Sequence, residues 1–139
     1  MSFQNPDPEM LCAMLRNEVK TIAVVGLSPN AHRPSHRIAA GLQREGFRVI
    51  PVRPMVREVL GEPAYPELAS VPVPVDLVNV FRAAAEVGAI VDDCLRLGLK
   101  RIWIQEGIVN EAAALRARAG GMTVVMDRCI LSHYRAYCA

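Results

Sequence analysis

Five short apolar runs, separated by helical patterns and polar loops, constrain the fold of this chain more than any other feature. We expect strands at residues 21–26, 47–52, 76–82, 101–105 and 123–127. The runs are continuous rather than alternating, which is typical of parallel strands buried on both faces. Helical spacing follows several of them, most clearly at Val87, Ile90, Val91 and Cys94. The pattern predicts an α/β fold: a Rossmann-type, doubly wound, mainly parallel five-stranded sheet with helices on both faces.

A chain of 139 residues is long enough for one domain with one core, so we expect a single domain over 1–139. Asp7-Pro8-Glu9 favours a leading helix at about 8–18, and Pro34-Ser35 can open the next helix. Residues 55–74 contain four prolines and predict irregular structure, with at most a short helix around 65–69. A C-terminal tail at about 130–139 is expected to hold a short helix.

Composition excludes several classes of function. A net charge of +2, with arginines scattered rather than clustered, argues against nucleic-acid binding. The apolar stretches are strand-sized, and the start has no leader pattern, so we expect a cytoplasmic protein without a membrane partner. His32 and His36 lack a third ligand nearby, so no metal site is predicted.

The four cysteines, at positions 12, 94, 129 and 138, show no paired spacing. They predict reduced thiols, as is usual in a cytoplasmic protein. Cys12 and Cys94 fall on apolar helix faces and are expected in the core, as is Trp103 within its strand. Cys129 follows a strand beside Arg128, whose charge favours a thiolate, although a buried inert cysteine is the alternative.

Ligands of open α/β sheets bind at the carboxyl ends of the strands, which directs attention to the loops that follow them. Gly26 ends the first strand and supplies the first glycine of a dinucleotide fingerprint, with Ser28 in the second glycine position. The amide and hydroxyl of Ser28 could contact a pyrophosphate, and Arg33 precedes a helix start that attracts anions. The alternatives are that Gly26 only makes the turn and that Ser35 only caps the helix.

The later loops favour a phosphorylated ribose over NAD. Residues 51–54 read Pro-Val-Arg-Pro, so Arg53 stands where NAD-binding proteins usually carry a carboxylate. Arg53 would suit the 2′-phosphate of NADP or the 3′-phosphate of CoA, or be a solvated surface residue. Phe81 and Arg82 follow the third strand and could line a pocket, with edge packing of Phe81 as the alternative. Gln105 and Gly107 follow the fourth strand, where a glycine permits close approach to a ligand.

Seven segments in this order resemble the stand-alone CoA-binding proteins, which are similar to the N-terminal domain of the succinyl-CoA synthetase α subunit. They are 22–28, 33–35, 49–52, 75–78, 80–82, 103–108 and 127–129, and the resemblance covers about residues 8–131. It implies a Rossmann-type domain that holds CoA across its strand ends. The family commonly has Asn where this chain has Arg53, so the contact of that residue differs. The residues assigned to binding are Gly26, Leu27, Ser28, Arg33, Pro34, Ser35, Val52, Arg53, Pro54, Phe81, Arg82, Gln105, Gly107 and Cys129.

Three functions remain open on the sequence. The first is non-catalytic binding of coenzyme A or acyl-CoA at the carboxyl edge of the sheet. The second is an NADP-dependent or other nucleotide-dependent enzyme on the same fold, against which the missing glycines and acid/base pair count. The third is an adaptor with an empty groove. The synthetases carry their phosphorylated histidine in a second domain, so we expect no acyl-CoA ligation by this chain alone. Exposed apolar helix surface could support a homodimer.

Overall fold

The computed structural model describes residues 2–139 and contains a five-stranded parallel sheet in the order β2-β1-β5-β6-β7. The strands are β1 (Thr21–Val25), β2 (Arg48–Val52), β5 (Leu77–Val80), β6 (Arg101–Ile104) and β7 (Thr123–Met126). The helices are α1 (Pro8–Asn17), α2 (Pro34–Arg44), α3 (Val87–Arg96), α4 (Glu111–Ala119) and α5 (Ile130–Tyr137). The order reverses after β1, so the doubly wound α/β class predicted from the sequence is confirmed.

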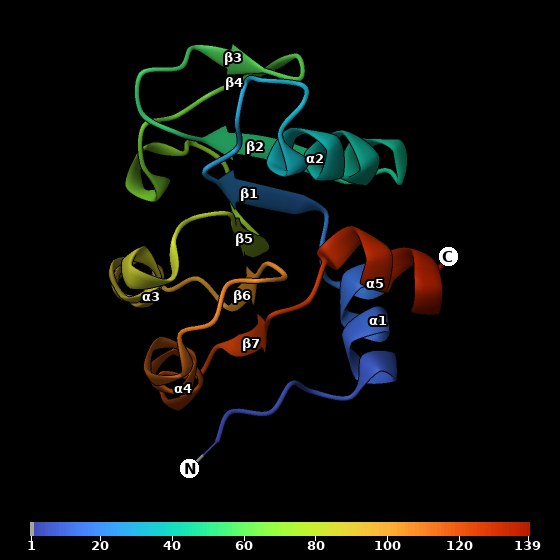
Figure 1. Cartoon of the computed structure of the whole chain (residues 1–139), viewed down its shortest axis with the longest axis vertical. Coiled ribbons are helices and arrows are strands. Elements are labelled where there is room, and N and C mark those ends of the chain that lie inside the picture. The colour runs from blue at the N-terminus through green and yellow to red at the C-terminus, as the bar shows by residue number, and fades with distance from the viewer. Residues whose placement is uncertain (1) are drawn as a thin grey trace.

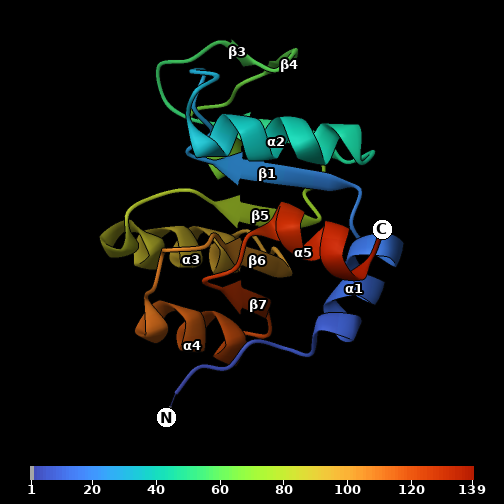
Figure 2. The same ribbon diagram turned by 45° about the vertical axis from the view of Figure 1, so that its right-hand side comes forward.

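Two helical layers cover the sheet (Figures 1 and 2). Helices α1, α2 and α5 bury one face, where Leu11, Leu42 and the fully enclosed Trp103 form the core. Helices α3 and α4 bury the other face around Val91, Ile104 and a row of small alanines. Trp103 and Cys94 lie in the core as predicted. Within residues 2–139, no helix combines the length and the apolar character that crossing a bilayer requires.

Each edge strand of the sheet hydrogen-bonds to another part of the chain at its carboxyl end. At β7, the Asn5 side chain donates to the Met126 carbonyl at 2.9 Å and accepts from the Met126 amide at 2.8 Å. At β2, Tyr65 exchanges backbone hydrogen bonds with Pro51 and Arg53. An unpaired edge is a template for association with other chains, so these contacts replace neighbouring strands.

The segment between β2 and β5 is more ordered than the sequence predicted. It contains a small hairpin, β3 (Glu58–Val59) with β4 (Glu62–Pro63), and a 3-10 helix, Leu68–Ser70, in place of a helix around 65–69. Leu60 and Gly61 form the hairpin turn with φ of 54° and 77°. Positive φ at both turn positions usually selects Asn or Gly, so the leucine concealed the turn. The second 3-10 helix, Ala84–Glu86, leads into α3.

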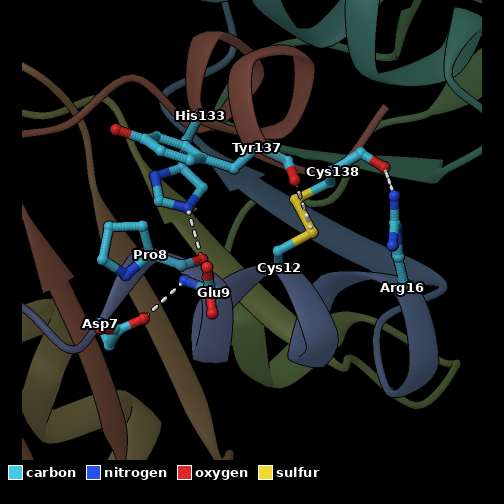
Figure 3. The surroundings of a disulfide bond; sticks show 8 residues. All are labelled: Asp7, Pro8, Glu9, Cys12, Arg16, His133, Tyr137 and Cys138. Carbon is cyan, nitrogen blue, oxygen red and sulfur yellow. Dashed lines mark hydrogen bonds between the residues drawn. A yellow bond between two sulfur atoms is a disulfide. The ribbon is translucent and has the colours of Figure 1, made fainter.

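The prediction of four reduced thiols is wrong for one pair: Cys12 of α1 and Cys138, directly after α5, form a disulfide (Figure 3). The two residues lie 126 positions apart in sequence, yet their Cα atoms are 5.2 Å apart because α1 packs against α5. Arg16 also donates to the Cys138 carbonyl. The link therefore joins the two ends of the chain, and only Cys94 and Cys129 remain as free thiols among residues 2–139.

We expect Cys138→Ser to lower the free energy of unfolding by roughly 2–4 kcal/mol, because the disulfide closes a long loop in the unfolded chain. Urea titrations with and without a reducing thiol measure the effect. Reduction should destabilise the wild-type chain to the level of the variant and leave the variant unchanged. Equal stability of all four samples would contradict a stabilising cross-link.

Candidate functional site

A cavity of about 790 Å³ lies along the carboxyl ends of the strands. Its walls come from the loop after β1, the start of α2, and the ends of β2, β5, β6 and β7. The topology explains the convergence, because all five strands are parallel and end at one rim of the sheet. Gly26 and Arg33, from the loop after β1, therefore share one cleft with Gln105, which follows β6. The lining residues are Gly26, Ser28, Pro29, Asn30, Arg33, Pro34, Ser35, Ile38, Arg53, Phe81, Arg82, Ala83, Gln105, Glu106, Ile108 and Cys129.

Gly26 lets the backbone of β1 pass close to the end of β5. Its φ is 90°, and a Cβ there would collide with the Phe81 carbonyl oxygen and lie 2.9 Å from the Arg82 Cδ. Its amide donates to the Val52 carbonyl at 2.9 Å, and the Phe81 amide donates to the Val25 carbonyl at 2.9 Å. A side chain is therefore excluded twice, by conformation and by space.

The loop after β1 is held by its own polar side chains. The Ser28 amide donates to the Ser35 Oγ at 3.0 Å, and the Asn30 amide donates to the Ser28 Oγ at 3.1 Å. His36 Nδ1 contacts the Ser28 carbonyl at 3.0 Å. The Ser28 amide, which we expected to be free to contact a pyrophosphate, thus donates its hydrogen bond to Ser35. Ser35 holds the loop and does not cap α2. Both serines are buried, so they fix the shape of the cavity wall.

The three arginines of the cavity differ in their availability to a ligand. Arg33 is exposed at the N-cap of α2 and has no side-chain hydrogen bond or ion pair with any of residues 2–139. Arg53 reaches the Gly26 carbonyl at 3.4 Å. Arg82 forms an ion pair with Glu86, and that hydrogen bond raises the pKa of Arg82 and lowers the pKa of Glu86. Positive charge therefore gathers at Arg33 and Arg53, beside the positive end of the α2 dipole.

Gln105 is 4% exposed and links the cavity to the start of α5. Its Oε1 accepts from Asn79 Nδ2 at 3.2 Å and from the Ile130 amide at 3.4 Å. Asn79 is fully buried in β5 and also donates to the Trp103 carbonyl at 3.1 Å, while its Oδ1 has no partner among residues 2–139. A polar residue inside an apolar strand was the available signal, and sequence reasoning missed it. Asn79 positions Gln105.

Four of the residues assigned to binding do not line the cavity. Leu27 is fully enclosed and Val52 nearly so, because each turns its side chain into the core. Pro54 is exposed beyond the rim. Gly107 is also exposed, and its amide donates to Asp127 Oδ1 at 2.8 Å, so its φ of 85° serves a turn rather than close approach to a ligand. Pro29, Asn30, Ile38, Ala83, Glu106 and Ile108 line the cavity without having been predicted.

The model of the CoA binding domain family matches residues 20–135, which includes every strand of the sheet and most of α5. The chain belongs to the CoA binding domain family. The match spans the whole rim that carries the cavity.

Relatives of this CoA binding domain include small proteins and one segment of a large enzyme. An uncharacterized protein, YneT of Bacillus subtilis (strain 168), is 38% identical over 128 residues, covering 92% of this chain and 94% of that protein. A segment of acetate–CoA ligase [ADP-forming] I of Archaeoglobus fulgidus is 35% identical over 77 residues, covering 55% of this chain but only 11% of the ligase. The homology is therefore to one part of the ligase.

The fold is shared with solved structures. Prb, described as PH1109 protein redesigned for binding, superimposes with a TM-score of 0.91 at 28% identity, covering 97% of this chain and 94% of Prb. This agreement extends beyond the sheet to nearly the whole chain. This chain therefore has the same Rossmann-like arrangement as Prb.

We expect Gly26→Ala to destabilise the fold by roughly 2–4 kcal/mol, since it combines an unfavourable φ with a collision. Gly46→Ala is the matched control, because Gly46 has a φ of 100° but nothing within 4 Å of the added methyl group. Chemical denaturation should give the control a loss of only about 1 kcal/mol. Equal losses would show that the approach to Phe81 imposes no constraint.

The two free thiols should differ in reactivity. Cys94 is fully buried, and burial, with the nearby Asp93 charge, raises the pKa of its thiol to about 12. Cys129 is half-buried and lines the cavity. Iodoacetamide at pH 8 should therefore modify Cys129 and leave Cys94 unmodified until the chain unfolds, as peptide mass spectrometry can measure. Labelling of both at equal rates in the folded chain would contradict this placement.

Proposed function

We propose that this protein binds coenzyme A, without catalysing a reaction, in the cavity at the carboxyl edge of its sheet. The observation that carries the proposal is the placement of Arg33 and Arg53 on one cavity wall, next to the N-terminus of α2. Guanidinium groups and a helix N-terminus are complementary to phosphate groups. Membership in the CoA binding domain family supports CoA as the source of those phosphates.

In this proposal the nucleotide lies at the β1–β2 end of the cavity. Arg53, at the end of β2, would pair with the 3′-phosphate, and Arg33 would pair with the pyrophosphate. Arg82 would contribute its aliphatic stem to the wall, because Glu86 already neutralises its charge. Phe81, Gln105 and Ile108 would border the pantetheine arm, which runs along the strand ends towards β7.

Binding rather than catalysis is proposed from the chemistry of the lining. The titratable side chains that face the cavity, among residues 2–139, are three arginines, Glu106 and Cys129. No histidine lies among them to act as a base for the thiol or for a bound water. Glu106 and Cys129 line the cavity without a hydrogen bond between their side chains, so they do not form a paired acid and base.

Calorimetric titration with CoA, dephospho-CoA, NADP and NAD tests the proposal. We expect CoA to bind most tightly and loss of the 3′-phosphate to weaken binding by about tenfold or more, as for a charge-assisted hydrogen bond. Arg53→Gln should lower the affinity for CoA to that of dephospho-CoA and leave the affinity for dephospho-CoA unchanged. Arg57→Gln, at an exposed position outside the cavity, is the matched control.

The remaining outcomes decide between functions. A preference for NADP over CoA would favour a nucleotide-dependent enzyme, since Arg53 also suits a 2′-phosphate. If none of the four ligands binds, the proposal of CoA binding is overturned and the interpretation of the chain as an adaptor with an empty groove is favoured. Protection of Cys129 from iodoacetamide by CoA, but not by NAD, would support the placement of the pantetheine arm.

We also propose that residues 1–139 act as one domain in the cytoplasm, where CoA is abundant as a ligand, and that a homodimer forms through exposed apolar helix surface. A cytoplasmic location contrasts with the Cys12–Cys138 disulfide, because thiol reductants keep most cytosolic cysteines reduced. Thiol trapping before lysis measures the state of this pair in cells, and sedimentation velocity measures the oligomeric state.

A further inference from the structure

A second cavity, of about 910 Å³, adjoins the first at the β7 end of the sheet. Its walls come from residues 3–11, the ends of β6 and β7, and the exposed side of α5. It lies between the N-terminal segment, which runs past α4 and β7 into α1 (Figure 2), and the C-terminal helix α5. Nothing in the proposed function of CoA binding uses this space.

The two cavities meet at two residues. Glu106, after β6, and Cys129, after β7, line both of them. The first cavity extends from Arg53, after β2, to Cys129, which lies over β6: Trp103 Nε1 donates to the Arg128 carbonyl at 3.0 Å, and the Ile130 amide donates to Gln105 Oε1 at 3.4 Å. Three strand spacings of about 4.8 Å, from β2 to β6, make this distance roughly 14 Å. A ligand extended along the first cavity from its phosphates would therefore reach Cys129, which also lines the second cavity.

The chemistry of the lining changes along this path. Arg33 and Arg53 lie at the β1–β2 end, whereas half of the second cavity is apolar, formed by Phe3, Pro6, Pro8, Leu11, Val109, Met126, Ala136 and Tyr137. Val109 is 52% exposed and Tyr137 is 57% exposed, which makes them two of the few large apolar side chains left open to solvent. Exposed apolar side chains gathered around a hollow mark a binding surface.

Asn5, Asp127, Arg128 and His133 bond to the protein itself, whereas the Gln4, Glu106 and Ser132 side chains have no hydrogen bond with any of residues 2–139. The Asp127 carboxylate accepts from the Gly107 amide, and the Arg128 guanidinium donates to the Asp127 carbonyl at 2.7 Å. His133 Nε2 contacts the Pro8 carbonyl at 3.3 Å, and burial lowers the pKa of His133, so its ring is uncharged at neutral pH. These groups leave the apolar side chains as the surface that a ligand would gain most from covering.

The walls of the second cavity are tied together before any ligand binds. The Cys12–Cys138 disulfide and the His133–Pro8 contact join α1 to α5 (Figure 3). Asn5 holds the preceding segment against Met126. A preformed site loses less conformational entropy on binding than a site that must first be ordered.

We propose that the second cavity holds the acyl group of an acyl-CoA thioester, and specifically an uncharged, apolar acyl chain. The thioester would lie at the junction formed by Glu106 and Cys129, with the nucleotide in the first cavity. This inference rests on the proposed function and specifies its ligand: acyl-CoA in preference to free CoA.

Titration with CoA, acetyl-CoA, butanoyl-CoA, octanoyl-CoA and succinyl-CoA tests it. Full burial of one methylene strengthens binding by about fourfold, and the cavity is open on one side, so octanoyl-CoA should bind about tenfold or more tighter than acetyl-CoA. Butanoyl-CoA should bind more tightly than succinyl-CoA, which has the same number of acyl carbons and an added carboxylate.

Two tryptophan variants locate the acyl group. Ala136 is exposed on α5 and lines the second cavity, so Ala136→Trp should remove the gain from the octanoyl chain and leave binding of free CoA unchanged. Ala112→Trp is the matched control, because Ala112 is exposed on α4 and lines neither cavity. The control should retain the full preference for octanoyl-CoA.

The outcomes separate this inference from the proposed function. Equal affinities for CoA and all acyl-CoAs would overturn the acyl site and leave CoA binding standing, and so would tighter binding of succinyl-CoA than butanoyl-CoA. If the preference for octanoyl-CoA survives in Ala136→Trp, the acyl group lies elsewhere and the inference is overturned.

If no acyl-CoA is preferred and Ala136→Trp abolishes self-association, the inference is also overturned, and the second cavity binds a second copy of the protein. Failure of every CoA ligand to bind would overturn the proposed function itself.

Discussion

The parallel hydrogen-bonded register of the five strands is the constraint on which the candidate site depends. Each strand lies beside a neighbour that runs in the same direction, so every loop that follows a strand emerges at the same rim. The apolar interiors of the strands fill the two cores, and polar side chains are displaced to the ends. Arg53 and Cys129, from opposite edges of the sheet, face one cavity for this reason.

A small polar network connects the sheet to the helix that follows it. Asn79 of β5 donates to Gln105, directly after the neighbouring strand β6, and Gln105 in turn accepts from the first amide of α5. Burying two amide side chains in an apolar core is costly unless they are paired. Here the pairing fixes the end of β6 relative to α5. The two cavities meet beside this network, so it sets the relative position of both.

The two chain ends complete the same region. The N-terminal segment pairs with the open edge of β7 through Asn5, and α1 is then cross-linked to the end of α5. The elements that close the edge of the sheet therefore also form the walls of the second cavity. Stability and the shape of the proposed acyl site arise from the same contacts.

The sequence by itself determined the strands, the order of elements and the rim on which polar residues gather, because these follow from local periodicity and from the direction of parallel strands. It also singled out Gly26, Arg53 and Gln105, since each stands where an apolar run ends, and Arg33, since it directly precedes a helix start. Local patterns could not reveal that Leu27 and Val52 turn inward, that Glu86 neutralises Arg82, or that Asn79 supports Gln105.

Only the tertiary structure decided the Cys12–Cys138 pair and the second cavity. Both depend on α1 packing against α5, two helices separated by nearly the whole chain. The spacing of two residues in sequence carries no information about such a contact, because the packing of the whole sheet between them determines how close the two helices come.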